Sequence, residues 1–270
     1  MIGKDFPLYL QPSAITYNLL PITHYPGPLT LNLFMNIRVG CCGFPRVRSE
    51  YYKVFGAVEV QQTFYQPPSL KTAEKWREAA PSDFEFTLKA WQLITHESKS
   101  PTYRRLKLGW HAEKLARCGS FKGTEEVVWA WEKTQEIAAA LQAKYVVFQC
   151  PASFHPSAEN RRKLETFFSE VKRENLRLIW EPRGTWTPGE IRDLCRELDL
   201  IHGVDPFKAD PQWGPVRYFR LHGVTGYRYH FSGEDLERLR QKCSGEDYCF
   251  FNNVNMWTDA LAFRDRVQES

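Results

Sequence analysis

Several common signatures are absent from this sequence of 270 residues, and each absence excludes a class of protein. It has no run of about 18 apolar residues and no basic start followed by an apolar stretch, which argues against a membrane span and a signal peptide. Its seven cysteines form no CxxC spacing, which argues against a zinc cluster or a disulfide framework. These absences predict a cytoplasmic protein with reduced thiols.

Charge is nearly balanced, with 36 Lys and Arg against 32 Asp and Glu and a formal net charge of +4. This net charge is far below the dense positive charge that is typical of proteins whose main partner is nucleic acid. The balance permits an anionic partner without requiring one. A hydrophobic content of 43% over 270 residues is enough for one large core.

The first 34 residues differ from the rest because prolines interrupt every candidate helix. These prolines are Pro7, Pro12, Pro21, Pro26 and Pro28. We predict an irregular extension over residues 1–34, outside a single domain over 35–270. The alternatives are a segment that docks on the domain or on a partner, or a start of translation at Met35.

The remaining sequence alternates β-rich runs with helical stretches. The expected strands are residues 37–42, 57–65, 84–90, 145–150, 176–181, 200–205, 216–221 and 248–253. The expected helices are residues 69–80, 130–143, 157–175, 187–198, 232–243 and 256–267, with Ser69 and Ser232 as candidate N-caps. Eight βα units predict an α/β fold, a (β/α)₈ TIM-type barrel. A doubly wound sheet is the alternative, but the sequence lacks a GxGxxG fingerprint and a Walker lysine.

Active sites of such barrels lie at the carboxyl ends of the strands, where side chains of equal parity point inward. The polar residues that this rule places in the mouth are Glu59, Gln61, Thr63, Lys89, Gln149, Glu181, Arg183, Asp205, Arg220, His222 and one of Asn252 and Asn253. Unpaired ions there cost several kcal/mol each. So many together predict a ligand site.

Structural roles remain open for the same residues. Glu181 with Arg183, or Glu59 with Arg220, are candidate ion pairs across the barrel. Gln149 and Asn252 are able to form hydrogen bonds with loop backbone. Asp205 precedes a proline, which suits a turn. His96 follows the third strand on a loop, where an exposed histidine without a catalytic role is the alternative.

A long segment follows the third strand, and we call residues 97–122 the basic insertion. It carries seven Lys or Arg against two Glu. Tyr103, Trp110 and Phe121 are interleaved with these charges, which suits stacking on bases. A lid over an anionic substrate and a solvated, partly helical excursion are the alternatives.

Nine ordered motifs between Ile37 and Phe263 resemble the YecE-like family, domain of unknown function seventy-two, and its archaeal branch in particular. They are "VGCCGF", "VEVQQTFYQPP", "FTLKAWQLITH", "FQCPASF", "WEPRGTW", "VDPF", "YFRLHG", "GYRYHFS" and "FNNVNMWTDA". The resemblance implies a TIM barrel and no accepted activity. The motifs include Glu59, Lys89, His96, Gln149, Glu181, Arg183, Asp205, Arg220, His222 and Asn252.

The first functional hypothesis is a hydrolase or isomerase acting on a phosphorylated or otherwise anionic substrate. Lys89, Arg183 and Arg220 would bind the anion. Glu59 or Glu181 would act as general base and His222 as acid or base. The residues expected to complete the substrate site are His96, Gln149, Asp205 and Asn252.

Three alternatives remain. A divalent metal could be held by Glu59, Glu181, Asp205 and His222. Lys89 could form a Schiff base, as in a lyase or aldolase. The basic insertion could bind nucleic acid, with the barrel as its scaffold.

Overall fold

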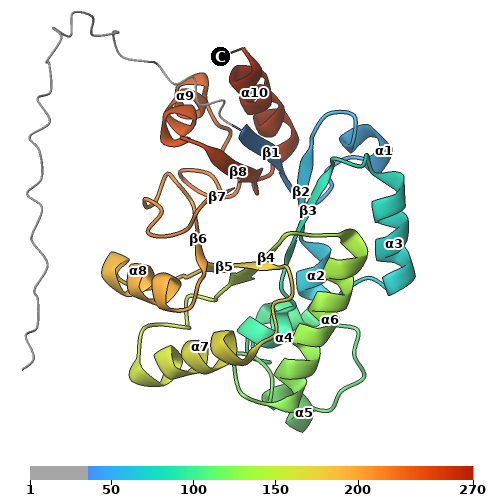
Figure 1. Cartoon of the computed structure of the whole chain (residues 1–270), viewed down its shortest axis with the longest axis vertical. Coiled ribbons are helices and arrows are strands. Elements are labelled where there is room, and N and C mark those ends of the chain that lie inside the picture. The colour runs from blue at the N-terminus through green and yellow to red at the C-terminus, as the bar shows by residue number, and fades with distance from the viewer. Residues whose placement is uncertain (1–35, 270) are drawn as a thin grey trace, which may run out of the picture. The chain divides into compact units, whose positions relative to one another are not determined.

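Eight parallel strands form a closed barrel in a computed structural model that describes residues 36–269 (Figure 1). The strands follow sequence order, as predicted. They are β1 (Asn36–Cys42), β2 (Ala57–Val60), β3 (Glu85–Lys89), β4 (Tyr145–Gln149), β5 (Arg177–Glu181), β6 (Ile201–Val204), β7 (Arg217–Leu221) and β8 (Glu246–Phe251). Strand β1 pairs with both β2 and β8, which closes the sheet. The extension predicted over residues 1–34 lies outside the described residues.

Helices surround the barrel and connect its strands (Figure 1). The longer ones are α3 (Leu70–Ala79), α6 (Glu125–Leu141), α7 (Ala158–Glu170), α8 (Pro188–Glu197), α9 (Gly233–Lys242) and α10 (Met256–Gln268). The short ones are α1 (Arg48–Tyr51), α2 (Gln62–Tyr65), α4 (Gln92–Thr95), the 3-10 helix η1 (Pro101–Arg105) and α5 (Ala112–Ala116). Ser69 and Ser232 cap α3 and α9 through their hydroxyls, as predicted. No helix in residues 36–269 is long and apolar enough to cross a membrane.

Strand β2 is shorter than predicted, because the chain turns into helix α2 at Gln62. The prediction that Thr63 points inward from a strand is therefore wrong. The Thr63 hydroxyl contacts the carbonyl oxygens of Val60 and Lys89, at 2.8 and 2.7 Å. Aromatic and β-branched residues made this segment resemble a strand, but these tertiary contacts favour a helical turn.

The barrel interior has an apolar layer beneath a charged one. Its buried apolar cluster comprises Cys42, Ala57, Tyr145, Val147, Ile179, Ile201, Val216, Tyr218, Tyr248 and Phe250. Above it, at the carboxyl ends of the strands, the inward positions hold Glu59, Lys89, Glu181 and Arg220. The polar residues that parity selected thus lie at the mouth of a filled barrel.

Candidate functional site

Arg220 of β7 lies at the centre of the mouth and is fully buried. Its Nε and Nη2 donate to the two carboxylate oxygens of Glu59 on β2, at 2.8 and 2.7 Å. Its Nη1 donates to Glu181 of β5 and, at 2.9 Å, to Gln149 Oε1 of β4. The second Nη2 hydrogen faces Cys42 Sγ at 3.8 Å. All five guanidinium donors therefore have protein acceptors.

Glu59 is equally enclosed. Besides Arg220, its carboxylate accepts from the Tyr218 hydroxyl at 2.9 Å, from the Gln61 amide and from Cys42 Sγ at 3.4 Å. Burial alone would lower the pKa of Arg220, but Glu181 and Glu59 hold that pKa well above its usual range. Arg220 is a permanently charged centre bound to two carboxylates, so the geometry gives it a structural place rather than an open anion site.

Glu181 connects this network to a more open group. Burial raises the pKa of its carboxyl, but Arg220 and Arg183 outweigh burial and lower the pKa to about 2. Arg183 Nη2 lies 2.7 Å from Glu181 Oε1 and 3.0 Å from His222 Nε2. The Arg183 side chain is 32% exposed, and its Nε has no hydrogen-bond partner among the described residues. This Nε is buried, so the exposed end of the guanidinium, which lines the pocket described below, is the part that a ligand could contact.

His222 lies between Glu181 and Asp205. Its Nδ1 is 3.5 Å from Asp205 Oδ2, and its backbone N–H donates to the same oxygen at 3.1 Å. Asp205 Oδ1 accepts from the Phe207 N–H at 3.1 Å. Asp205 thus has the turn role that its sequence position allowed, and it also fixes the start of the loop that carries His222.

A pocket of about 250 Å³ opens beside these residues, between the ends of β5 and β6 and helix α8. Glu181, Arg183, Asp205 and Lys208 supply its charged groups. Gly203 forms part of its wall, where a Cβ atom would come within 2.7 Å of Ile179 Cγ2 and 3.6 Å of the Glu181 Cβ. The absence of a side chain at Gly203 therefore lets Ile179 pack closely against the backbone of β6, beside Glu181.

Lys89 differs from every other cation of the mouth. It is 6% exposed, and within residues 36–269 its Nζ has neither a hydrogen bond nor a carboxylate within 4.0 Å. The Nζ instead lies 3.6 Å from the centre of the Phe64 ring. Burial lowers the pKa of Lys89, and repulsion from Arg220 lowers it further, to about 7, against the attraction of Glu181 and Glu59. Near neutral pH this amine is therefore present in both protonation states.

His96 also contacts Phe64, with an edge-to-face geometry and a distance of 4.9 Å between the two ring centroids. Its Nδ1 is 2.7 Å from the Thr95 hydroxyl. Burial and the nearby Lys89 lower the pKa of His96 to about 3. His96 is thus a neutral, buried imidazole beside the mouth, not an exposed loop histidine.

The two asparagines after β8 have different surroundings. Asn253 is fully buried and donates to the Tyr229 carbonyl and to Asp259 at 2.7 and 2.6 Å, so it supports the loops. Asn252 is half-buried, has the inward parity of Phe250, and makes no side-chain hydrogen bond within the described part of the chain. Asn252 is therefore the asparagine that remains available to a ligand.

The four residues of the metal hypothesis do not form a ligand set. Among residues 36–269, no group of three or more His, Cys, Asp or Glu side chains is arranged to hold a metal ion. Glu59 is directed toward Arg220 and Tyr218, whereas Asp205 contacts the backbone of His222 and Phe207. Arg220, rather than a cation from solution, neutralises the two buried carboxylates.

The basic insertion packs by means of its aromatic residues. Phe121 is 1% exposed and contacts Phe154 and Phe167, the Trp110 ring lies 5.1 Å from that of Trp129, and the Tyr103 hydroxyl donates to the His96 carbonyl. The expectation that these rings are free to stack on bases is therefore wrong for Phe121, whereas Tyr103 and Trp110 are half-buried and already contact protein groups. The lid function of the insertion stays a prediction.

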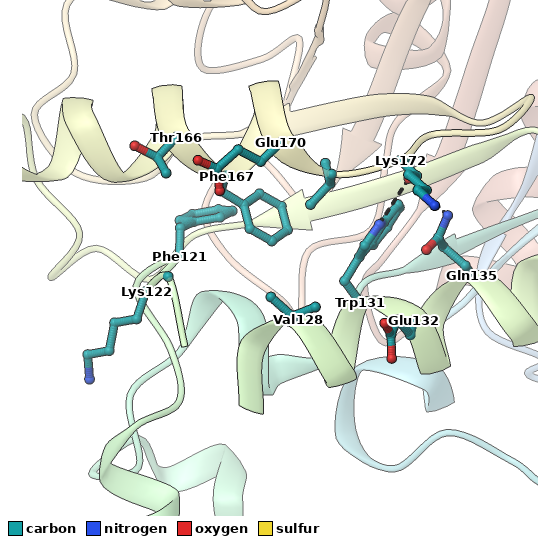
Figure 2. A pocket seen from close by; sticks show the side chains of 12 residues that line it. Phe121, Lys122, Val128, Trp131, Glu132, Gln135, Thr166, Phe167, Glu170 and Lys172 are labelled. Carbon is teal, nitrogen blue, oxygen red and sulfur yellow. Dashed lines mark hydrogen bonds between the residues drawn. The ribbon is translucent and has the colours of Figure 1, made fainter. Parts of the chain in front are cut away.

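A second cavity, of about 250 Å³, lies outside the barrel between helices α6 and α7. Figure 2 shows the side chains that line it. Phe121, Val128 and Phe167 contribute apolar walls, and the Trp131 indole donates to the Lys172 carbonyl at 3.0 Å. Phe121 and Lys122 of the basic insertion line this cavity, but none of the residues predicted for the barrel mouth does. It is therefore separate from the chemistry of the mouth.

Sequence reasoning missed three residues that complete the site. Cys42 and Tyr218 have inward parity and contact Glu59, so the rule that selected Arg220 could also have found them. Phe64 lies on the unpredicted helix α2, and no sequence signal pointed to its position over Lys89.

Comparison with known proteins places this architecture among its relatives. The family model described as "Protein of unknown function DUF72" matches residues 45–270. No curated protein matches the chain. Since a likeness to structures below 25% identity shows fold alone, the matched structures support the barrel and leave the chemistry open.

Three solved structures illustrate the likeness. A DUF72 family protein from Enterococcus faecalis V583 has a TM-score of 0.67 at 20% identity, covering 87% of this chain and 98% of its own. One from Thermotoga maritima MSB8 has a TM-score of 0.58 at 20% identity, with coverages of 86% and 99%. A D-psicose 3-epimerase with D-fructose has a TM-score of 0.52 at 12% identity, with coverages of 86% and 96%.

Proposed function

Because this chain belongs to the DUF72 family, whose function is unknown, we propose its function from the residues at the mouth of its barrel. The proposed function is that of an isomerase-type enzyme acting on a small anionic carbonyl compound. In this proposal the substrate carries a hydroxyl group on the carbon next to the carbonyl, and Lys89 removes the proton from that carbon. The electron pair of the broken C–H bond forms a C=C bond while the carbonyl π pair moves to oxygen, which gives an enediolate. The hydroxyl proton then passes to the former carbonyl oxygen, and the Lys89 ammonium returns its proton to the former carbonyl carbon, so that the carbonyl group has moved by one position.

One observation carries the proposal, namely that Lys89 is a buried amine without a carboxylate partner. Its pKa of about 7 gives a large fraction of free base at neutral pH, whereas an ordinary lysine is almost fully protonated. Lysines of this kind serve as general bases or nucleophiles. Arg220 contributes by position, since its charge lowers the pKa of Lys89 while its own donors are occupied.

Arg183 and His222 are the groups that we assign to the anionic part of the substrate. Arg183 borders the pocket beside Glu181 with a side chain that is 32% exposed, and its Nη2 lies 3.0 Å from His222 Nε2. Lys208, 51% exposed and 3.9 Å from Asp205, adds a second cation to the neighbouring pocket. His96, Gln149, Asp205 and Asn252 remain predicted contributors to the substrate site, with His96 as a neutral donor or acceptor.

The epimerase among the matched structures agrees with this reaction class, although its identity to this chain is only 12%. Hydrolysis of a phosphorylated substrate is the less favoured version, because Glu59 is enclosed and poorly placed to activate water. The finer assignments, to a YecE-like, archaeal-type branch and to the cytoplasm, stay predictions.

Deuterium exchange tests the proposed proton transfer without knowledge of the product. The protein is incubated in D₂O with a panel of small sugar phosphates, neutral sugars and keto acids, and the carbon next to each carbonyl is followed by proton NMR. We expect exchange in at least one anionic compound. Lys89→Met should lower its rate by about 100-fold or more, the usual contribution of a general base.

The exposed Lys71 supplies the matched control, since Lys71→Met should leave the exchange rate unchanged. Arg183→Met should weaken exchange for anionic compounds more than for neutral ones. Absence of exchange across the panel, or equal rates in Lys89→Met and the parent protein, would refute the proposal. Borohydride reduction of the same mixtures distinguishes an imine mechanism from proton transfer by the free amine, because only an imine leaves a covalent adduct on Lys89.

A further inference from the structure

The loops that follow β7, β8 and β1 expose apolar side chains at one part of the barrel rim. We define this β7–β8–β1 rim as residues 222–232, 252–255 and 43–47. It contains four of the seven large hydrophobic side chains exposed in residues 36–269, namely Val47, Val224, Tyr227 and Val254. The three strands are neighbours in the barrel, so their loops belong to one side of the mouth.

Direct contacts hold these loops together. The Val254 N–H donates to the Tyr227 carbonyl at 2.8 Å, which links the β7 loop to the β8 loop. Arg46 of the β1 loop lies over the ring of Trp257, just beyond the β8 loop, at 5.8 Å. Gly223 has a φ of 90°, and a Cβ there would meet the Gly226 carbonyl oxygen at 2.2 Å. This tight turn directly precedes Tyr227, whose side chain is 56% exposed.

The charge of the rim has one sign. The three loops contain no Asp or Glu, but they include Arg46 and Arg228, and Arg48 follows at the start of α1. All three arginines are exposed, and none forms an ion pair within the described residues. Their side chains therefore remain able to bind an anion.

A buried carboxylate lies beside a histidine on the same rim. Asp259 of α10 is fully buried, and its Oδ1 lies 2.5 Å from Nδ1 of His230, whose side chain is 66% exposed. The other oxygen of Asp259 accepts from Asn253 at 2.6 Å. Since Nδ1 faces Asp259, the opposite ring nitrogen of His230 is directed to the exposed side.

We propose that the β7–β8–β1 rim binds single-stranded nucleic acid. Such binding combines cations along the phosphate backbone with aromatic rings on which bases stack. The rim offers both elements, with Tyr227 as the ring, the aliphatic Val224 and Val254 beside it, and the arginines and His230 for phosphates. The rings of the basic insertion are less available than Tyr227, because Phe121 is buried and Tyr103 and Trp110 are half-buried against other protein groups. The proposal does not depend on the chemistry at Lys89.

Fluorescence anisotropy with a labelled single-stranded DNA of mixed sequence tests the rim. We expect binding that weakens steeply as salt rises from 50 to 200 mM, as phosphate contacts require. Tyr227→Ala should lower affinity about 5-fold or more, whereas Tyr227→Phe, which keeps the ring, should stay near the parent value. The double change Arg46→Glu with Arg228→Glu should lower affinity about 10-fold or more.

Charge reversal in the basic insertion provides the matched control. Arg104→Glu with Arg105→Glu makes the same change in net charge, and we expect less than a 3-fold loss of affinity. Equal losses from both pairs, or no effect of Tyr227→Ala, would overturn the proposal. Undetectable binding of DNA at 50 mM salt would also overturn it. The same holds if the parent protein binds no DNA but self-associates with rising concentration, and Tyr227→Ala abolishes that self-association. Circular dichroism confirms that each surface variant is folded.

Discussion

Arg220 and Lys89 are both buried cations in one barrel mouth, yet their surroundings are opposite. Arg220 has two carboxylates, an amide oxygen and a thiol around its five donors. Lys89 has the face of Phe64 and no carboxylate within ion-pair distance in the described chain. Burial disfavours charge at both positions, and only Arg220 is compensated.

Arg220 and Lys89 therefore have different roles, although both appear in the sequence as inward cations at the ends of strands. A compensated ion holds three strands together, since β2, β5 and β7 meet through Glu59, Glu181 and Arg220. An uncompensated amine costs stability, and this cost is expected where a site is prepared for a ligand. The following predictions test whether this contrast holds, in order of decreasing effect.

Arg220→Met should cause the largest loss of stability. The substitution leaves Glu59 buried without its cation and Glu181 with Arg183 alone, and breaking such a buried group costs about 3 to 5 kcal/mol. Urea denaturation monitored by fluorescence measures the change in the free energy of unfolding. The exposed Arg104→Met is the control, expected within about 0.5 kcal/mol of the parent. A loss below about 1 kcal/mol for Arg220→Met would contradict the structural role.

Lys89→Met should raise stability at neutral pH, by about 4 kcal/mol at most, because it removes an uncompensated charge. The Lys89 pKa is about 7 in the folded protein, against 10.5 for an ordinary lysine such as that of the unfolded chain. Between these values the unfolded chain binds the extra proton, so the free energy of unfolding of the parent should rise with pH from 7 to 10.5.

The gain from Lys89→Met should therefore fall toward zero across that interval. Urea denaturation at several pH values measures it, with Lys71→Met as the matched exposed control. If the two lysine variants show the same pH dependence, Lys89 is not the uncompensated amine that the geometry indicates.

Gln149→Leu should have the smallest effect, about 1 kcal/mol, because one N–H of Arg220 loses its neutral acceptor while both carboxylates remain. The exposed Gln62→Leu controls for the change of side-chain type. If Gln149→Leu destabilised the protein as much as Arg220→Met, the network would depend on the amide as much as on the ion pairs.

Much of the fold could be predicted from the sequence because its signals are local. Alternation of β-rich and helical runs located all eight strands, and Ser69 and Ser232 marked two helix starts through ordinary capping chemistry. The end of β2 could not be predicted in this way. Its position depends on the contact of Thr63 with the Lys89 carbonyl, 26 residues away in the chain.

The inward direction of the site side chains could be predicted from the sequence, but the pairs that they form could not. Parity placed Glu59, Lys89, Glu181 and Arg220 inward, as the structure does. Parity does not give distances, however, and Arg220 and Glu59 are 161 residues apart in sequence. Which cation would be compensated and which left alone depends on side-chain reach within the closed barrel. The pair of His230 and Asp259 depends on the loops in the same way.

Gly203 lets two neighbouring strands approach closely beside the mouth. A Cβ atom at this position would lie 2.7 Å from Ile179 Cγ2, closer than two such carbon atoms normally come, and Ile179 belongs to the buried apolar cluster of the barrel. Replacing Gly203 with alanine should therefore displace Ile179 or separate β5 from β6. The bare backbone at Gly203 thus sets the spacing of the two strand ends that border the pocket.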